Sequence, residues 1–333
     1  MLFTFCRNGI FLSAKGTNIN EKTKGILFAV TTALMWSILA IFLKLALQFI
    51  DTFSIVWVRF LLAGIFLSIY LARTSPSALN LRPLLRKGPL LATVCLAFNY
   101  YGYMRGVEYT SPSSAQLVIQ IGPLILALSG IFYFKEKLTR AQLSGLILFV
   151  LGLMAFYVDQ WKGGAVGHDD YVAGVIWIGL AAIAWGAYAI IQKVTLIRAH
   201  PQALNLFINI ACVIIYAPAT DFKTLLSLSP YQFLILFILG VNTFIAYGCM
   251  VESLKRIPAN QVSIIITLNP LLTLSLMQTF KYFKWNFIAY ENISLLGIAG
   301  ALILIVGAIL VVGKNPKKLL NFYSRSKLGL QGK

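Results

Sequence analysis

Residues 25–44 read GILFAVTTALMWSILAIFLK, and residues 174–193 read GVIWIGLAAIAWGAYAIIQK. Both stretches place a glycine, a tryptophan and a lysine at successive steps of eleven and eight residues, and the second begins 149 residues after the first. Each is close to the roughly 20 apolar residues that cross a hydrocarbon core as an α-helix. The chain is therefore predicted to contain one membrane-spanning unit in two copies.

The similarity of the two halves continues beyond these stretches, with matching residues in the same order and at similar spacing. Internally doubled membrane proteins are typically secondary transporters, whose substrate site lies between the halves near the bilayer midplane. The duplication therefore indicates a class of function as well as a fold. The matching pairs are Tyr101 with Tyr247, Gly102 with Gly248, Met104 with Met250, Pro112 with Pro258, Glu136 with Glu291, Gly145 with Gly300, and Gly152 with Gly307.

The composition is that of a polytopic membrane protein. Hydrophobic residues make up 59% of the chain and charged residues 11%, with a mean hydropathy of +0.81, well outside the balance of a soluble domain. The four cysteines form no CxxC pair, and His168 and His200 lie in connecting segments, so no metal site and no cofactor are predicted. The net charge of +18 does not indicate nucleic acid binding, because the sequence contains no soluble domain with a basic face.

Ten apolar stretches predict an all-α membrane protein with ten transmembrane helices. Short loops rich in lysine and arginine stay in the cytoplasm, and with the amino terminus inside, 21 of the 28 basic residues fall on that side. Both termini are therefore predicted to be cytoplasmic. Five spans per half is an odd number, so the second half enters from the opposite side and the two repeats are inverted. The predicted spans are 24–43, 52–72, 88–107, 111–134, 141–158, 172–192, 201–219, 230–254, 258–280 and 293–313.

This topology divides the chain into five segments. The apolar patch near the amino terminus is too short for a signal-peptide core, so this segment is predicted to be a cytoplasmic extension. The linker between the halves carries Asp159, Asp169 and Asp170, which suits an external position. The segments are the extension at 1–23, the first five-helix repeat at 24–158, the external linker at 159–171, the second, inverted five-helix repeat at 172–313, and a basic cytoplasmic tail at 314–333.

Several motifs identify a family resemblance. Arg59 lies inside the second span, residues 107–115 read VEYTSPSSA, Pro123 lies in the middle of span four, and residues 136–145 read EKLTRAQLSG. From about residue 24 to 313 the chain resembles the EamA-like transporters of the drug/metabolite transporter superfamily. It departs from the pattern where span seven has no arginine and where an insertion near 281–290 precedes the second glutamate. The resemblance implies transport of small metabolites, often amino acids, nucleotide precursors or drugs, by proton-coupled exporters or by facilitators.

Three residues are the first candidates for a substrate site. Arg59 lies seven residues into span two, and a guanidinium there must meet water, a carboxylate or backbone carbonyls. It is either a structural anchor or a direct ligand of a substrate carboxylate. Trp36 and Trp185 occupy matching mid-span positions, where tryptophan is unusual. They are either packing residues or the walls of a cavity, and as walls they would stack on a planar or apolar substrate.

Polar residues and prolines in the spans supply further candidates. Buried amides and phenols need partners, which can be a substrate or a neighbouring helix. Pro123 and Pro270 each remove a helical hydrogen bond in the middle of a span and are predicted to kink it. Such breaks are tolerated where protein or a cavity satisfies the freed carbonyls. The other predicted substrate-binding residues are Asn99, Tyr101, Gln120, Tyr188, Tyr247 and Asn269.

The acidic residues indicate which kind of carrier to expect. Glu252 precedes Arg256 by four residues, which favours a local ion pair, and Glu108 is close to Arg105 in the same way. Glu136 and Glu291 flank the starts of spans five and ten, where a carboxylate is favourable at a helix amino terminus. No acid lies deep within a span. The sequence therefore favours a facilitator or an exchanger over a proton pump, while Glu252 keeps coupling open.

The sequence predicts a carrier that moves a small organic metabolite, foremost an amino acid or a related amine, across the inner membrane by alternating access, in export or exchange. A nucleotide-type metabolite such as S-adenosylmethionine is the alternative substrate, and a channel or a membrane scaffold is the alternative role. No enzyme activity is predicted, because no paired catalytic groups occur in the spans. The predicted partners are a small-molecule substrate and the lipid bilayer. Monomer and homodimer are both left open.

Overall fold

The computed structural model describes residues 20–134, 139–163, 168–195, 200–284 and 291–312, and the regular structure in these ranges is helical. The prediction of an all-α membrane protein with ten spans is confirmed, and spans four and nine are each divided into two helices. The spans are α2 (Glu21–Ala46), α3 (Thr52–Thr74), α4 (Lys87–Tyr109), α5 (Pro112–Val118) with α6 (Ile121–Phe134), α7 (Arg140–Gly163), α8 (His168–Thr195), α9 (Pro201–Tyr216), α11 (Pro230–Arg256), α12 (Ala259–Ile266) with α13 (Asn269–Tyr282), and α14 (Leu295–Val312).

Short helical turns connect some of these spans: Pro76–Leu79 and Arg82–Leu84 lie between α3 and α4, and Ala217–Ala219 with α10 (Phe222–Leu226) lies between α9 and α11. Several predictions fall outside the described residues: most of the 1–23 extension, the tail at 314–333, most of the insertion, and Glu136. More of the predicted 159–171 linker is helical than the sequence suggests, because α7 extends to Gly163 and α8 begins at His168.

Asp159 explains why α7 continues past the predicted end of the first repeat. Its side chain is 7% exposed, and its carboxylate accepts hydrogen bonds from the backbone N–H and the hydroxyl of Ser294, immediately before α14. A carboxylate is favourable at this helix start. Asp159 therefore holds the end of α7 to the beginning of α14, in place of the exposed linker position that its charge suggests in the sequence.

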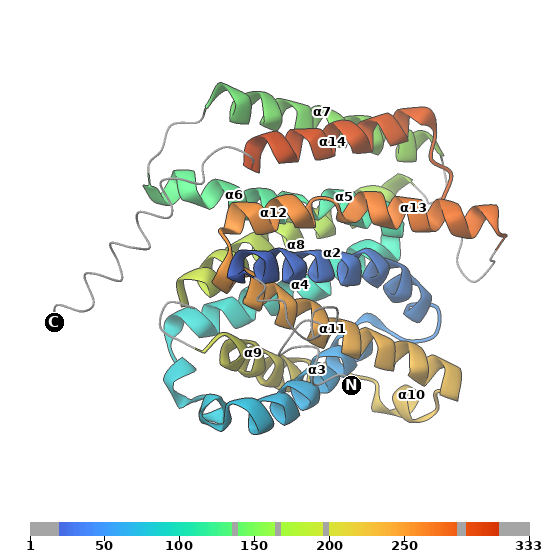
Figure 1. Cartoon of the computed structure of the whole chain (residues 1–333). Coiled ribbons are helices and arrows are strands. Elements are labelled where there is room, and N and C mark those ends of the chain that lie inside the picture. Colours follow the sequence, from blue (N-terminus) through green and yellow to red (C-terminus); the bar gives the residue numbers. More distant parts are fainter. Residues whose placement is uncertain (1–19, 135–138, 164–167, 196–199, 285–290, 313–333) are drawn as a thin grey trace.

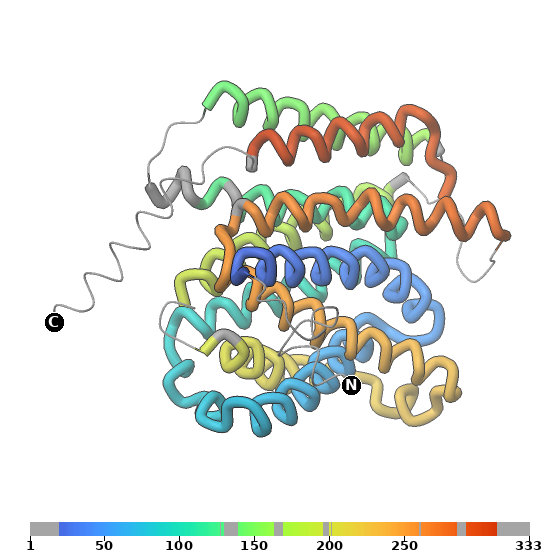
Figure 2. Tube along the Cα trace, in the orientation of Figure 1, coloured from blue at the N-terminus to red at the C-terminus, as the bar shows by residue number. Residues whose placement is uncertain are grey.

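The two halves interlock, because every main helix pair joins one helix of each repeat. The pairs are α7 with α14, α4 with α8, α2 with α11, α3 with α9, and the broken spans α5–α6 with α12–α13. Figures 1 and 2 show α7 and α14 together as an outermost layer, and the two broken spans as the next layer toward α2 and α8. Equivalent helices thus occupy equivalent places, as expected for two inverted copies.

The outermost pair is built on the glycines that the two repeats share. A Cβ atom built on Gly145 would lie 2.7 Å from the carbonyl oxygen of Gly307, and one on Gly152 would lie 2.5 Å from that of Gly300. The equivalent glycines therefore face one another crosswise, and α7 and α14 run antiparallel with their backbones in contact. Small residues permit this close approach of helices in membranes.

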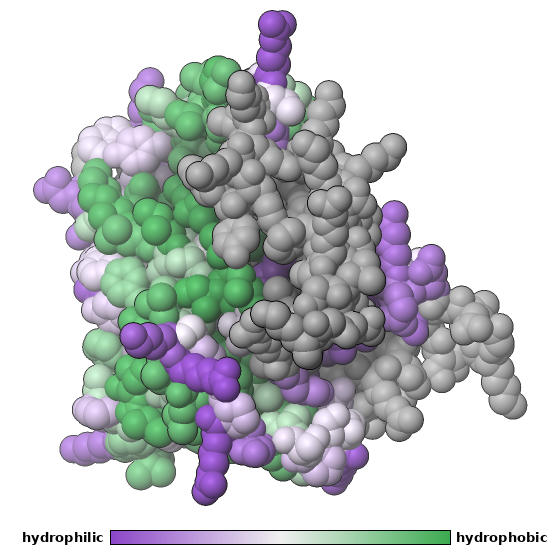
Figure 3. Space-filling view, turned by 90° about the vertical axis from the view of Figure 1, so that its left-hand side faces the viewer, coloured by the Kyte–Doolittle hydropathy of each residue, from purple (hydrophilic) through white to green (hydrophobic). Residues whose placement is uncertain are grey.

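The outer faces of the helices are apolar. Within the described part of the chain, seven helices are long and apolar enough to cross a membrane, and two shorter apolar segments, Pro112–Leu126 and Leu295–Val311, accompany them. Figure 3 shows hydrophobic side chains over much of the uncovered part of one face, with hydrophilic side chains projecting around them. Exposed apolar surface of this extent suits contact with lipid. Examples are Leu91, Val94, Ile147, Met154, Ile183, Ile214, Phe233 and Val306.

Candidate functional site

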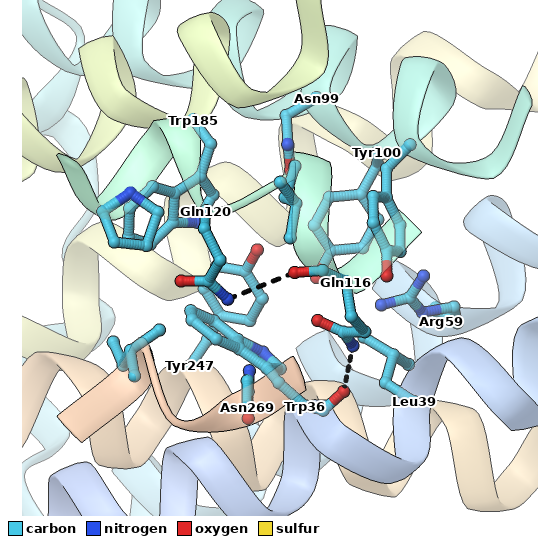
Figure 4. Close-up of a pocket in the computed structure, with 14 residues that line it drawn as sticks. Trp36, Leu39, Arg59, Asn99, Tyr100, Gln116, Gln120, Trp185, Tyr247 and Asn269 are labelled. Atoms are coloured by element: carbon cyan, nitrogen blue, oxygen red, sulfur yellow. Dashed lines mark hydrogen bonds between the residues drawn. The ribbon is translucent and has the colours of Figure 1, made fainter. Parts of the chain in front are cut away.

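A cavity lies between the two halves, where the broken spans meet α2, α3, α4, α8 and α11 (Figure 4). Its volume is about 60 Å³, which is room for about four water molecules. A larger ligand requires the lining side chains to move apart. The lining residues are Trp36, Leu39, Arg59, Asn99, Tyr100, Tyr103, Gln116, Ile119, Gln120, Pro123, Trp185, Tyr247, Ile266 and Asn269.

The helix breaks place polar groups at the cavity. α5 ends at Val118, α6 begins at Ile121, and Pro123 lies in the first turn of α6. In the second half, α12 ends at Ile266 and α13 begins with Asn269 and Pro270. Both proline positions therefore coincide with interruptions that open onto the cavity, as irregular backbone in a membrane requires.

The amides at these breaks have unused hydrogen-bonding capacity. Gln116 donates from its side chain to the carbonyl oxygen of Trp36 at 2.6 Å, and Gln120 donates to the carbonyl oxygen of Gln116 at 3.3 Å (Figure 4). Both side-chain amides are almost fully buried. The side-chain oxygens of Gln120 and Asn269 are buried and have no hydrogen-bond partner among the described residues. Such acceptors carry a desolvation cost that a ligand with N–H or O–H donors would remove.

Three aromatic rings form one wall of the cavity. The Trp36 ring centroid lies 5.7 Å from that of Trp185 and 5.4 Å from that of Tyr247, both in edge-to-face geometry. Edge-to-face contacts stabilise aromatic pairs. The two tryptophans therefore pack against one another across the repeat boundary and also line the cavity. The sequence leaves helix packing and a cavity wall as alternatives, and in the structure the same side chains do both.

Arg59 is 2% exposed and faces this cavity from α3. Its guanidinium carbon lies 4.4 Å from the ring centroid of Tyr100, and Nε donates to the hydroxyl oxygen of Thr243 at 3.1 Å. Among the described residues this is its one hydrogen bond. No carboxylate among the described residues lines the cavity, so within this part of the chain the cation lies beside a ring face without a counter-ion. A buried charge in this situation favours an anionic ligand.

Most of the predicted site residues meet at this cavity, namely Trp36, Arg59, Asn99, Gln120, Trp185, Tyr247 and Asn269. Two lie outside its lining. Tyr101 stacks on Phe53 with ring centroids 5.0 Å apart, because it is one residue, and so about 100° of helix rotation, from Tyr100. Tyr188 lies behind Tyr247 and its hydroxyl accepts a hydrogen bond from Gln192 at 2.6 Å.

Sequence reasoning also left out several lining residues. Gln116 precedes Gln120 by one helical turn, and Tyr103 follows Asn99 by one turn. Residues four apart lie on the same helix face, so this spacing was the available signal. Tyr100 is adjacent to Asn99 and approaches Arg59 from α4. Three apolar lining residues, Leu39, Ile119 and Ile266, carry no polar signal at all.

A chain of buried amides leads away from Tyr188 on the side predicted to be cytoplasmic. Gln192 donates to the side-chain oxygen of Asn205 at 3.2 Å, and Asn205 donates to that of Gln202 at 3.4 Å. Gln202 in turn donates to the carboxylate of Glu252 at 3.2 Å. This amide chain joins α8, α9 and α11. Buried amides need such partners, and each amide nitrogen in the chain has one, while the side-chain oxygen of Gln192 is buried and has no partner among the described residues.

Glu252 ends this chain in an ion pair. Its carboxylate accepts from Arg256 four residues later, and Arg256 also donates to Glu21 at 3.1 Å. The local pair that the sequence spacing suggests is therefore present, and it also ties α11 to the start of α2.

Comparison with known proteins identifies the family. The EamA-like transporter family matches residues 23–158 and 172–313, once for each repeat. The chain belongs to the EamA-like transporter family. An inner membrane transporter of Escherichia coli K12, YhbE, named as uncharacterized, is 34% identical over 86% of this chain and 90% of its own length. An uncharacterized transporter of Haemophilus influenzae is 32% identical over 86% and 94%.

A solved crystal structure shares the fold. It is 20% identical in sequence, covers 86% of this chain and 96% of its own chain, and superposes with a TM-score of 0.63. As an EamA-like transporter, the protein is a membrane transporter with two copies of the family's repeat unit, and the predicted family resemblance is confirmed. This membership is compatible with the prediction that the chain is not an enzyme.

Proposed function

We propose that this EamA-like transporter is a carrier for a small organic metabolite with a carboxylate group, foremost an amino acid, which it exchanges or exports across the inner membrane. The observation that supports this most is the cavity between the repeats, where Arg59 is the one charged side chain that the described residues contribute to the lining. A substrate carboxylate would neutralise it. An amine without an acidic group would meet a cation and no carboxylate, so the structure favours the amino acid over the related amine.

The remaining lining groups suit the rest of such a substrate. The ring faces of Trp36, Trp185 and Tyr247 would pack on an apolar or planar side chain and can also attract an ammonium group. The free oxygens of Gln120 and Asn269 would accept hydrogen bonds from the same ammonium. Alternating access would come from movement of one repeat against the other around this cavity, with both termini in the cytoplasm.

Counterflow in proteoliposomes tests this function. Vesicles are preloaded with a pool of amino acids and nucleoside-type metabolites, including S-adenosylmethionine, and uptake of each labelled compound is followed. We expect saturable exchange of one carboxylate-bearing compound. Trp185→Ala removes one ring of the cavity wall, and loss of a buried aromatic contact of roughly 1.4 kcal/mol would lower the apparent affinity about tenfold.

The control for this variant is Trp161→Ala, which removes a tryptophan of α7 that does not line the cavity. Exchange by this variant should stay near that of the unmodified protein. Equal loss in both variants would place the substrate elsewhere, and unsaturable flux would indicate a channel. Exchange confined to S-adenosylmethionine would select the nucleotide-type alternative.

A further inference from the structure

Two charged side chains from distant parts of the chain hold the junction of α4 and α5. The first is Lys44, in the last turn of α2. Its ammonium group donates to the carbonyl oxygens of Val107 at 2.8 Å, Glu108 at 2.8 Å and Thr110 at 2.7 Å. Those carbonyls lie at the carboxyl end of α4, where a cation is favourable. Lys44 therefore uses its three donors to fix the end of α4.

The second is Glu291, which precedes α14 and belongs to the other repeat. Its side chain is 6% exposed, and one carboxylate oxygen accepts from the backbone N–H of Ser113 at 3.0 Å. The sequence suggests that Glu291 supports the start of span ten. The structure corrects this, because the carboxylate instead contacts the first residues of span four. It thus forms a polar bond between the two repeats on the side predicted to be external.

This contact leaves hydrogen-bonding groups unused. The other carboxylate oxygen of Glu291 and the hydroxyl of Ser113 are both buried, and neither has a hydrogen-bond partner among the described residues. A charged carboxylate with one unpaired oxygen away from water is costly. Protonation of the carboxyl group would remove this charge. The neutral acid is therefore less costly to bury at this place than the carboxylate.

Burial raises the pKa of Glu291 above its ordinary value, and the hydrogen bond from the Ser113 backbone N–H and the positive charge of Lys44 oppose that rise. The ionisable groups around it come from several helices. Lys44 of α2 is the cation whose positive charge favours its carboxylate form. Tyr171 of α8 interacts with both Glu291 and Asp159 of α7, and Glu108 of α4 interacts with Lys44.

We propose that Glu291 is a proton-binding site that controls how the two repeats close the cavity on the side predicted to be external. As a carboxylate, it ties the second repeat to the Ser113 backbone and is attracted to Lys44. As a neutral acid, it loses that attraction, and the α4–α5 junction is held less firmly. The junction joins α4, which carries Asn99 and Tyr100, to α5, which carries Gln116. Protonation on the external side therefore affects the position of these lining residues through the two helices.

This inference rests on the proposed carrier function, and it adds a second acid to Glu252, which the sequence keeps open for proton coupling. Counterflow at external pH values from about 5 to 8, above the ordinary range of a glutamate, tests it. The exchange rate of the unmodified protein should change with pH. The change should be up to tenfold for each unit by which the pKa of Glu291 differs between the externally closed and externally open conformations. Glu291→Gln, a neutral mimic of the protonated acid, should exchange at one rate across this range.

Two variants sharpen the assignment. Asp221→Asn changes an exposed carboxylate on the same side, which caps α10, and should keep the pH profile. Lys44→Gln removes the cation but keeps an amide donor, and should shift the midpoint to higher pH because the carboxylate loses a stabilising charge. A Glu291→Gln variant that keeps the original profile would overturn the proposal, and an unmoved midpoint in Lys44→Gln would remove Lys44 from it.

Thermal unfolding of the purified protein provides a readout that does not depend on transport. Because the pKa of Glu291 is raised in the folded state, folding favours its protonated form. The contribution of this group to the free energy of unfolding is greatest at low pH. It falls as the pH rises from the ordinary pKa of glutamate through the raised pKa of Glu291. Glu291→Gln should lack that fall. If no substrate is exchanged but the fall depends on Glu291, the carrier proposal fails and the proton site stands; if the fall persists in the variant, the proton site is refuted.

Discussion

Replacing Arg59 with leucine is expected to lower substrate exchange by about 10- to 150-fold. This range corresponds to the 1.5–3 kcal/mol of a hydrogen bond to a charged group. The guanidinium has one hydrogen bond among the described residues, to Thr243, so most of its donors are free for a substrate carboxylate. The loss should appear as a raised apparent KM, measured by counterflow over a range of substrate concentrations.

Two further variants separate substrate binding from a structural role. Arg59→Lys keeps the charge but not the planar fork of donors, and should retain part of the activity. Arg105→Leu removes a partly exposed arginine that pairs with Glu108 at 2.6 Å, and should have little effect, as is usual for such pairs. If Arg59→Leu lowers the melting temperature sharply while the KM of the folded fraction is unchanged, Arg59 is an anchor and the carboxylate must bind elsewhere.

Much of the fold was predictable because it follows from local patterns. The length of each apolar stretch predicts a span, and a proline in the middle of a span predicts a break, which the structure shows between α5 and α6 and between α12 and α13. The repeated spacing of Trp36 and Trp185 also predicts that equivalent side chains occupy equivalent places. Two inverted copies bring these positions together at the boundary between them, and both rings lie there.

The parts of the site that escaped prediction depend on rotation and on distant contacts. Symmetry with Tyr247 favours Tyr101, but the cavity is lined by the neighbouring Tyr100, since one residue changes the helix face by about 100°. The partners of Lys44 and Glu291 lie far from them in sequence. No period or motif relates such residues, so only the folded arrangement brings them to the same junction.

For the glycines that the two repeats share, the sequence predicts which positions are equivalent, but only the helix packing determines which of them are in contact. Gly145 and Gly152 recur as Gly300 and Gly307, which the sequence shows. That the pairs face one another crosswise follows only from the antiparallel packing of α7 and α14. Each glycine is thus a point where two backbones touch, in the layer farthest from α3 and α9 (Figure 1).

Gly152→Ala is therefore expected to destabilise the folded protein by about 1–3 kcal/mol, the usual cost of overpacking a well-packed contact. Its new Cβ would lie 2.3 Å from the backbone nitrogen of Leu304 and 2.5 Å from the carbonyl oxygen of Gly300. Backbone atoms cannot rotate away as a side chain can, so α7 and α14 would have to separate. The separation would loosen the apolar cluster of Phe149, Phe156 and Leu304. Thermal or denaturant unfolding in detergent measures the change.

Gly179→Ala is the matched control, because it makes the same substitution in α8 where no atom lies within 4 Å of the added Cβ. Alanine favours a helix over glycine by about 1 kcal/mol, so this variant should be as stable as the original or slightly more so. Alanine at position 152 gains the same helix propensity, so Gly152→Ala is destabilising only if the steric cost of the added Cβ exceeds this gain. Equal stability of the two variants would mean that α7 and α14 can part without loss, and that the backbone contact between the repeats does not hold the outer layer in place.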